Sequence, residues 1–205
     1  MRAEQRRERE VARAREGIVE AAMRAFARSG LHGTTMHDIA CEAGYTAASL
    51  YTYFKSKQEI VEAMSNHLTD EYLQVFEDPM PSGLSFRQRF ELLLHRHLQV
   101  ADKRRNLFPL LSSDDPCPRS PQDQLFHANF ERRIAGLADW LGRNAKPQDL
   151  AGYDAKIVAR LVFGMAFGLF HQFSDQGGDS FLSCAPIITE FLFHGISSKP
   201  GARKK

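Results

Sequence analysis

The sequence predicts an all-α fold. Apolar residues recur with the 3.6-residue period of a helix in nearly every segment, and no segment alternates apolar and polar residues as a half-buried strand does. Clusters of glycine and proline separate these segments. With 205 residues, of which 43% are hydrophobic, the chain can bury a core but has little room for two large domains. We therefore expect a small N-terminal module joined to one larger helical domain.

The first predicted helix covers residues 18–29, and a charged extension, residues 2–16, precedes it. Its apolar residues share one face, and Gly30 follows as a stop signal. Three further helices are expected at residues 35–43, 46–54 and 56–76. Each begins with a hydroxyl residue that can accept hydrogen bonds from the free N–H groups at the start of a helix. Ser56 and Glu59 have the spacing of a capping box.

Longer helices are predicted in the rest of the chain, at residues 86–101, 126–141, 153–173 and 181–193. The last two are apolar nearly all round. We place the small domain at residues 1–60, with a charged arm at 1–14. The larger domain follows at 61–198, and a basic tail at 199–205.

The two short helices near the N-terminus have the spacing of a helix-turn-helix. Gly44 and Tyr45 connect them, and glycine allows the left-handed backbone that such a turn needs. Ile39 and Ala40 of the first helix and Leu50 of the second face inward. The opposite face of the second helix presents small or polar side chains that are available to DNA: Ala47, Ala48, Ser49, Thr52 and Tyr53.

Three motifs follow one another in order between residues 15 and 62. They read Ile18-x2-Ala21-Ala22-x3-Phe26-x3-Gly30, Thr34-Thr35-Met36-x2-Ile39-Ala40-x2-Ala43-Gly44 and Leu50-Tyr51-x-Tyr53-Phe54-Lys55-Ser56-Lys57. In this order they resemble the N-terminal domain of the tetracycline-repressor (TetR) family. The resemblance implies a homodimeric transcriptional regulator, usually a repressor, whose larger domain binds a small ligand that weakens DNA binding.

The resemblance also implies roles for single residues. Thr35 would offer its hydroxyl and N–H to a phosphate, at a helix start that attracts anions. Tyr51 and Tyr53 match phosphate-contacting aromatic positions, and Lys57 matches a basic contact. Ala47 and Ala48 replace a common Lys-Gly pair, and Thr52 stands where histidine is frequent. We therefore expect few hydrogen bonds to bases. The alanine methyl groups would contact thymine methyl groups, and three polar side chains would form the hydrogen bonds: Thr46, Ser49 and Thr52.

The net charge of +2 is unevenly distributed. Residues 1–60 hold 10 basic and 8 acidic side chains, residues 61–198 hold 13 and 17, and residues 199–205 hold 4 and none. Basic ends on an acidic middle suggest a polyanion bound near one terminus. The arginines of the arm are Arg2, Arg6, Arg7, Arg9 and Arg13. They either add a salt-sensitive contact to DNA or lie on a solvated helix on which glutamates balance their charge.

A dimer is expected because a single recognition helix reads only a few base pairs, so two would act on a palindromic operator. Residues 153–173 and 181–193 would form a four-helix interface, in which Gly164 and Gly168 permit close packing. The alternative is that both segments are core of a single chain. The expected interface residues are Leu161, Gly164, Met165, Gly168, Ile188, Phe191 and Leu192.

Fifteen Phe, six Met and one Trp suit an apolar or aromatic effector held between helices. Each candidate contact also fits an ordinary core position, and His97 fits either a hydrogen bond to an effector or a structural role. The candidates are Phe90, Leu94, His97, Phe108, Phe126, Phe130, Trp140 and Phe167.

No catalytic or metal-ligating set stands out, and we predict neither an enzyme nor a cofactor. His95 and His97, two residues apart, diverge on a helix. The longest apolar run, residues 157–173, is interrupted by polar residues, and the N-terminus lacks the apolar region of a signal peptide, so no membrane association is expected. The three cysteines are Cys41, Cys117 and Cys184. They fit no disulfide framework, which predicts a cytoplasmic protein.

The sequence therefore predicts a homodimeric regulator of double-stranded DNA that responds to an unknown small molecule. The alternative is a DNA-binding regulator or scaffold without a small-molecule effector, controlled by a protein partner. Whether transcription is repressed or activated depends on promoter geometry, which the sequence does not record.

Overall fold

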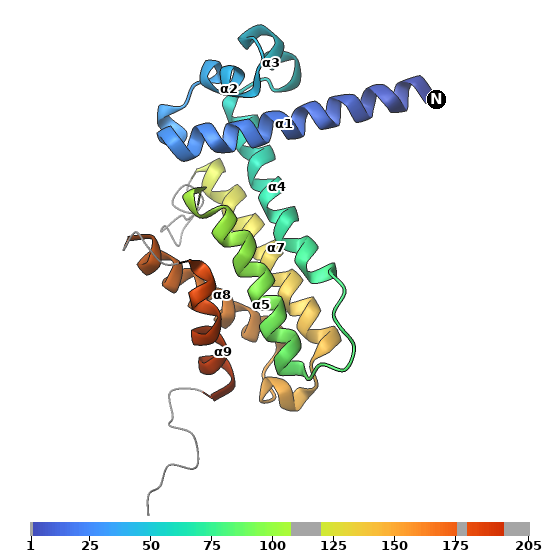
Figure 1. Cartoon of the computed structure of the whole chain (residues 1–205), viewed down its shortest axis with the longest axis vertical. Helices are drawn as coiled ribbons and strands as arrows, with labels where there is room; N and C mark the ends of the chain where they lie inside the picture. Colours follow the sequence, from blue (N-terminus) through green and yellow to red (C-terminus); the bar gives the residue numbers. More distant parts are fainter. Residues whose placement is uncertain (1, 108–119, 176–179, 195–205) are drawn as a thin grey trace, which may run out of the picture. The chain divides into compact units, whose positions relative to one another are not determined.

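The computed structural model describes residues 2–107, 120–175 and 180–194 (Figure 1). Within these ranges it consists of helices and contains no strand, which confirms the all-α class. The candidate Phe108 and the predicted basic tail lie outside the described residues. The elements are α1 (Arg2–Gly33), α2 (Met36–Ala43), α3 (Ala47–Tyr53), α4 (Lys57–Glu77), α5 (Phe86–Lys103), η1 (Arg105–Leu107), α7 (Pro121–Asn144), η2 (Pro147–Leu150), α8 (Ala155–Asp175), η3 (Phe181–Ser183) and α9 (Cys184–His194).

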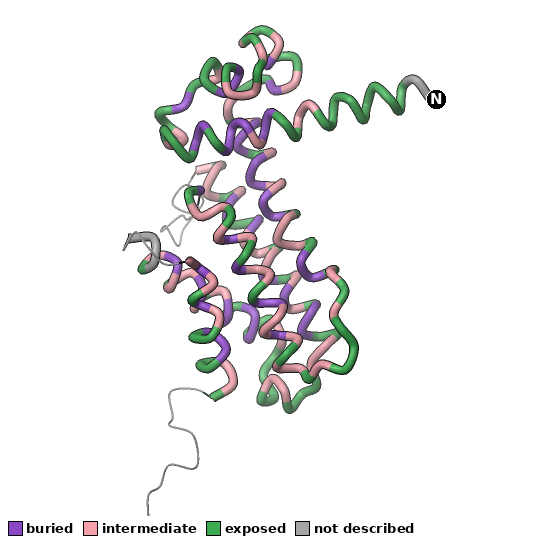
Figure 2. Tube along the Cα trace, viewed as in Figure 1, coloured by how far each residue is buried: buried purple, intermediate pink, exposed green. Residues whose placement is uncertain are grey.

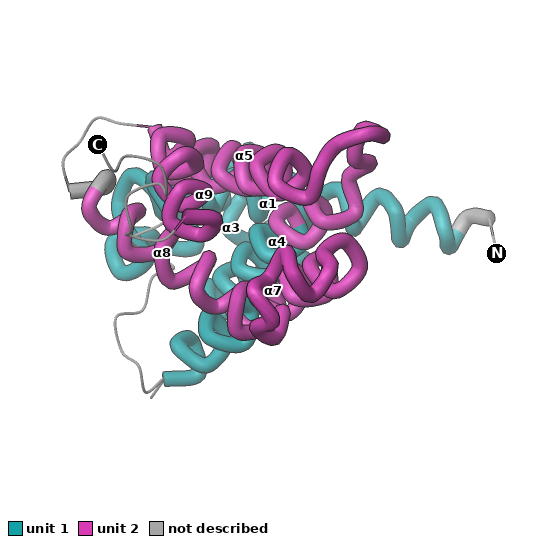
Figure 3. Tube along the Cα trace, turned by 90° about the horizontal axis from the view of Figure 1, so that it is seen from below, with its two compact units in different colours: residues 1–70, 106–129 teal, residues 71–105, 130–205 magenta. Residues whose placement is uncertain are grey.

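The chain forms two compact units, which Figure 3 shows in separate colours. Unit 1 comprises residues 1–70 and 106–129, and unit 2 comprises residues 71–105 and 130–205. Helices α4 and α7 each contribute residues to both units. The domain boundary that we place at residue 60 lies inside α4, and it stays a prediction about function.

Unit 1 packs α1, α2 and α3 around one apolar cluster. Only the second half of α1 takes part, since its first turns are exposed (Figure 2). The charged extension is continuous with the first predicted helix, and Gly30 interrupts that helix with φ 71° and ψ 169°. The large buried side chains of the cluster are Phe26, Ile39, Leu50, Phe54, Ile60 and Met64, joined by Phe126 of α7.

The start of α4 differs from the expected capping box. The Glu59 N–H donates to Ser56 Oγ over 3.2 Å, as predicted. The Glu59 carboxylate does not return to Ser56, because it accepts instead from the Lys55 N–H over 2.7 Å. This hydrogen bond is the main cause that lowers the pKa of Glu59, and Arg15 lowers it further by a smaller amount. One of the two hydrogen bonds of the predicted box is therefore present. The Glu59 carboxylate instead holds the backbone of Lys55, just after the end of α3.

Unit 2 is rich in aromatic contacts. The predicted apolar face of α5 is buried, at Phe90, Leu93, Leu94, Leu98 and Ala101. One aromatic group joins α5, α7 and α9, and the buried Trp140 contacts it through Phe86: its rings are Phe86, Phe90, Trp140 and Phe193. A second group joins α4, α5, α7 and α8: its members are Tyr72, Phe76, His97, Phe130, Phe163, Phe167 and His171.

Helices α8 and α9 leave apolar side chains uncovered in this chain. Seven large apolar side chains are exposed among the described residues, and five of them lie on α8, on α9 or just before α8. None of the described helices combines the length and apolarity that crossing a bilayer requires. We call the exposed set the α8–α9 face: Tyr153, Ile157, Leu161, Ile187 and Phe191.

Candidate nucleic-acid interface

A tight turn joins α2 and α3 (Figure 1). Gly44 ends α2 with φ 74° and ψ 26°, and its N–H donates to the carbonyls of Ala40 and Cys41. The Tyr45 N–H donates to the same Ala40 carbonyl over 2.8 Å. Glycine adopts this left-handed backbone without strain. The predicted two-helix unit is therefore present, and its glycine has the expected reason.

A reciprocal capping box closes the start of α2. Thr35 Oγ1 accepts from the Asp38 N–H over 3.2 Å, and the Asp38 carboxylate accepts from the Thr35 N–H over 2.8 Å and its hydroxyl over 2.6 Å. These bonds, the side-chain one first, lower the pKa of Asp38. Both groups of Thr35 that we assign to a phosphate are thus engaged within the chain. The spacing Thr-x-x-Asp is the sequence signal that identifies Asp38 as a member of this site.

The hydroxyl groups of α3 are partly engaged within their own helix. Thr46 Oγ1 accepts from the Ser49 N–H over 3.1 Å and donates to Ser49 Oγ over 3.0 Å. Thr52 Oγ1 donates to the Ser49 carbonyl over 2.7 Å. Thr46 and Thr52 are exposed and have acceptor lone pairs to offer, which suit the amino groups of adenine or cytosine. Ala48 is exposed beside them, whereas Ala47 and Ser49 are half-buried.

The two tyrosines of α3 have different surroundings. Tyr51 is 47% exposed, and its side chain projects from the helix. Tyr53 is half-buried and packs edge-on against Tyr45, with ring centroids 5.6 Å apart. The Tyr53 carbonyl accepts from the Arg15 guanidinium. Tyr51 is therefore the more accessible of the two for a partner outside the chain.

Lys57 has a structural role that the sequence did not indicate. Its Nζ donates to the carbonyls of Leu31 and Thr34 over 2.8 and 3.0 Å. These bonds fasten the segment between α1 and α2 to the start of α4. They use two of the three ammonium protons, and a contact from Lys57 to phosphate stays a prediction.

Three arginines of α1 are paired with acidic side chains of neighbouring helices. Arg15 binds Glu59 over 3.1 Å and lies over the Phe54 ring at 3.9 Å. Glu42 accepts from Arg24 and Arg28, bonds that lower its pKa. These contacts join residues far apart in the sequence, and periodicity gives no sign of them.

The arm is an exposed helix, and several of its arginines have no acidic partner among the described residues. Arg6 pairs with Glu10 over 2.9 Å. Other arginines of the arm are exposed and form no ion pair with a described residue: Arg7, Arg9 and Arg13. Figures 1 and 3 show the first turns of α1 extending beyond the rest of unit 1. Both interpretations of the arm therefore stay open, and the cations that DNA needs are present on it.

The effector candidates do not form one group. Phe126 belongs to the core of unit 1, and Leu94 is buried in unit 2. Phe90 and Trp140 are buried in the aromatic group around α9. The structure brings together three others in the second aromatic group of unit 2: His97, Phe130 and Phe167.

His97 is held neutral inside unit 2. Burial lowers its pKa to about 3, and the positive charge of Arg133 adds to the shift. The Leu93 carbonyl, one helical turn earlier, opposes this shift weakly. Its ring packs on Phe76 at 4.4 Å and on Tyr72 at 5.8 Å. At neutral pH the ring is therefore an uncharged donor and acceptor.

This burial predicts a pH dependence of stability. Because the folded pKa lies below the unfolded value of about 6.5, the unfolded state binds the proton first. The contribution is present above pH 6.5 and is lost as the pH falls toward 3. Between pH 7 and pH 5 the free energy of unfolding should fall by about 2 kcal/mol through His97.

Urea unfolding between pH 5 and 7 tests this expectation. The His97→Gln variant should lose that part of the slope, whereas His95→Gln, at an exposed position of the same helix, should keep it. Equal slopes for wild type and His97→Gln would contradict a neutral, buried His97.

The expected interface residues are mostly accessible. Leu161 and Phe191 are 56% and 49% exposed. Gly164 and Gly168 are exposed on α8, and Met165 and Leu192 are half-buried. Ile188 is a correction, because it is fully buried in unit 2. Ile187, which precedes it, is exposed in its place.

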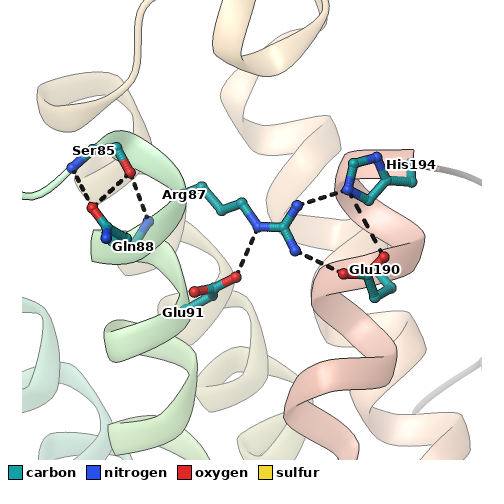
Figure 4. Close-up of polar contacts among 6 residues, drawn as sticks. All are labelled: Ser85, Arg87, Gln88, Glu91, Glu190 and His194. Carbon is teal, nitrogen blue, oxygen red and sulfur yellow. Dashed lines mark hydrogen bonds and ion pairs between the residues drawn. The ribbon is translucent and has the colours of Figure 1, made fainter. Parts of the chain in front are cut away.

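A groove of about 290 Å³ lies between α5 and α9. At its edge Arg87 donates to Glu91 over 2.8 Å and to Glu190 over 2.7 Å, and its guanidinium lies 2.7 Å from the His194 ring nitrogen (Figure 4). The Glu91 bond, then that to Glu190, raises the pKa of Arg87. The guanidinium is thus satisfied by the chain's own carboxylates, and it clamps α5 to α9.

Helices α1, α2 and α3 form a compact unit, in which α3 follows a tight turn and exposes a polar face. This arrangement defines a DNA-binding protein of the helix-turn-helix class. Residues 18–64 match the family model described as bacterial regulatory proteins, tetR family. The regulator TtgR of Pseudomonas putida is 30% identical over 166 residues, which cover 76% of this chain and 77% of TtgR. The chain belongs to the TetR family of transcriptional regulators.

Two further comparisons differ in coverage. The repressor KstR2 of Mycolicibacterium smegmatis is 38% identical over 95 residues, so the match covers 42% of this chain and about half of KstR2, 46%. The structure of FadR from Bacillus subtilis in complex with stearoyl-CoA has a TM-score of 0.71 at 19% identity. It covers 89% of this chain and 99% of that one, which shows a shared fold.

Proposed function

We propose that this protein is a homodimeric repressor that binds a palindromic operator through α2 and α3 and is released by a small effector bound in unit 2. The observation that supports it best is the exposed face of α3, with Thr46, Ala48, Tyr51 and Thr52 held outward by buried Leu50 and Phe54. A dimer gives two such helices, which match successive major grooves of a palindrome. The protein would act on DNA in the cytoplasm.

The α8–α9 face supports the proposed dimer. Its exposed Leu161 shares one side of α8 with two small exposed residues, Gly164 and Gly168, which follow at the i+3 and i+7 positions. Contiguous apolar patches on soluble proteins mark interfaces, and a two-fold axis would place the same face on both partners. The proposed interface keeps the predicted residues except Ile188, which Ile187 replaces.

The proposed effector has an apolar or aromatic body. The aromatic group around His97, Phe130 and Phe167 supports it, because several of these residues are half-buried. A sequence match and a structural match to Bacillus subtilis point the same way. The Bacillus subtilis FadR structure contains stearoyl-CoA, and a 24% identical protein of the same species is named fatty acid metabolism regulator. No observation favours control by a protein partner instead.

The proposed mechanism is a population shift. The effector favours a dimer in which the two recognition helices no longer match successive grooves. Helix α4 gives a continuous element for the coupling, because it begins at Lys57 and continues to Glu77 through Tyr72 of the aromatic group. Binding of effector and of operator should weaken each other by the same factor.

The experiment that tests this function is genome-wide binding of the protein in its native host, followed by footprinting of the enriched sites. We expect palindromic sites near promoters and higher transcription of the adjacent genes in a deletion strain. Enrichment without a shared two-fold sequence, or lower transcription after deletion, would contradict the repressor.

The arm should add a salt-sensitive term to operator binding. Deleting residues 1–12 removes four arginines from each protomer, among them the unpaired Arg7 and Arg9. If Arg7 and Arg9 of both protomers contact phosphates, the slope of log K against log salt should become shallower by about 3.6, or 0.9 per contact. Titrations at several salt concentrations measure it, with Glu8→Gln as the control. An unchanged slope and affinity would leave the arm as a solvated helix.

A further inference from the structure

One half-buried arginine of unit 2 has neither an acidic partner nor a hydrogen bond among the described residues. Arg133 lies on α7, with its guanidinium 5.0 Å from the centre of the Tyr72 ring and 5.5 Å from that of Phe130. Its Nε is buried and makes no hydrogen bond, and no ion pair joins Arg133 to a described residue. Burial lowers its pKa, which the Tyr72 ring opposes only in part.

Other arginines of the same unit have polar partners, including Arg89, which lacks a carboxylate but donates to the side chain and the carbonyl of Asn144. Arg104 binds Glu71 over 2.7 Å, and Arg160 binds Glu131 over 2.7 Å. Arg87 has two carboxylates of its own (Figure 4). Taking a charge out of water without a partner is strongly unfavourable, and two aromatic faces compensate only part of that cost. The unpaired guanidinium therefore presents N–H donors that suit an anion.

A second unsatisfied group lies next to it. Both ring nitrogens of His97 are buried, and neither makes a well-formed hydrogen bond with a described residue. Tyr72 is close to both groups, since its ring centre lies 5.0 Å from the Arg133 guanidinium and 5.8 Å from the His97 ring. Buried polar groups are normally satisfied. Two adjacent exceptions from different helices, α7 and α5, indicate a binding site for a polar ligand rather than a defect of packing.

Apolar rings continue from the polar end. Phe130, whose ring faces Arg133, contacts Phe163 at 5.6 Å and Phe167 at 6.5 Å. All three are half-buried. A charged end and an aromatic wall together fit a molecule with one anionic group and an apolar body.

We propose that Arg133, His97 and Tyr72 bind the carboxylate of an amphipathic acid whose apolar body lies along Phe130 and Phe167. The proposal rests on the effector-controlled function above, and it names the chemical class of the effector. A guanidinium binds a carboxylate through two parallel hydrogen bonds. The neutral His97 ring can donate a further one.

Matched acids and alcohols test this class at pH 7.5. The probes are decanoate with 1-decanol, and 4-phenylbutyrate with 4-phenyl-1-butanol, measured by calorimetry on the full-length protein. We expect at least one acid to bind about tenfold or more tighter than its alcohol, equivalent to about 1.4 kcal/mol. In Arg133→Met this preference should disappear while the affinity for the alcohol is kept. Acids no better than alcohols, or a preference that survives in Arg133→Met, would overturn the proposal.

Three further measurements distinguish a carboxylate site from a structural role of Arg133 and from a thioester site. Arg132→Met, at the exposed neighbouring position, should keep the preference for acids. Without ligand, Arg133→Met should melt at or above the wild-type temperature, and a lower temperature would make Arg133 structural. Decanoyl-CoA, in which the carboxylate is a thioester, should bind more weakly than decanoate. If decanoyl-CoA binds more tightly than decanoate, and Arg133→Met does not change its affinity, the proposal would also be overturned.

Operator binding separates this proposal from the function on which it rests. Ligand-free Arg133→Met should bind the operator like wild type, and decanoate or 4-phenylbutyrate should no longer release it. If wild type binds no operator but keeps its preference for acids, the repressor function fails and the ligand site stands. If operator binding is normal and the preference is missing, only the site fails.

Discussion

Replacing Tyr51 with alanine should weaken operator binding by about 10²- to 10⁴-fold and leave the fold and the dimer intact. Tyr51 is nearly half exposed and packs no core, so its loss should cost little stability. A hydrogen bond to a charged group contributes about 1.5–3 kcal/mol. A dimer loses two of them, or about 3–6 kcal/mol in total, which corresponds to the stated range.

The phenylalanine variant separates the hydroxyl from the ring. If the hydroxyl contacts phosphate, Tyr51→Phe should lose most of the affinity that Tyr51→Ala loses. Fluorescence anisotropy with a labelled operator measures both, and circular dichroism checks the fold. Ser29→Ala, at an exposed position of α1, should bind like wild type. Wild-type affinity for Tyr51→Ala would contradict the proposed docking.

Leu161→Arg should convert the dimer to monomers at micromolar concentration and abolish tight operator binding. Leu161 is 56% exposed and belongs to the α8–α9 face. A two-fold interface would bury the new charge twice. At about 2 kcal/mol for each charge, the dimer should dissociate about 10³-fold more readily.

Sedimentation velocity on wild type and variant measures this change. Ala135→Arg, which adds the same charge at an exposed position of α7, should stay dimeric. A wild-type monomer at micromolar concentration would refute the dimer itself. A dimeric Leu161→Arg would move the interface away from α8 and α9.

Local signals predicted the elements well. The helical period located most helices to within a few residues, because periodic burial and caps depend on nearby residues. The Gly44 turn followed for the same reason. The period missed the starts of α1, which begins at Arg2 rather than Ile18, and of α7, which begins at Pro121 rather than Phe126. The family motifs from Ile18 to Lys57 identified the DNA-binding unit, and the match over residues 18–64 supports them.

Contacts between distant residues were not predicted. Lys57 binds carbonyls 23 and 26 residues away, and Arg15 binds Glu59 across 44 residues. The list of effector candidates mixed core residues such as Trp140 and Phe126 with members of a half-buried aromatic group. An amphipathic pattern marks which side of a helix is buried, but it does not name the side chain opposite.

By itself the sequence determined the all-α class, the helix-turn-helix and the family, because these depend on local spacing and on an ordered motif. Only the tertiary structure decided that Ile188 is buried while Ile187 is exposed. It also decided that Arg133 and His97, which lie 36 positions apart in the sequence, come close together with buried nitrogens that have no acidic partner among the described residues. The physical reason is that burial and charge compensation depend on which helices pack together, and helix packing joins residues that the sequence keeps far apart.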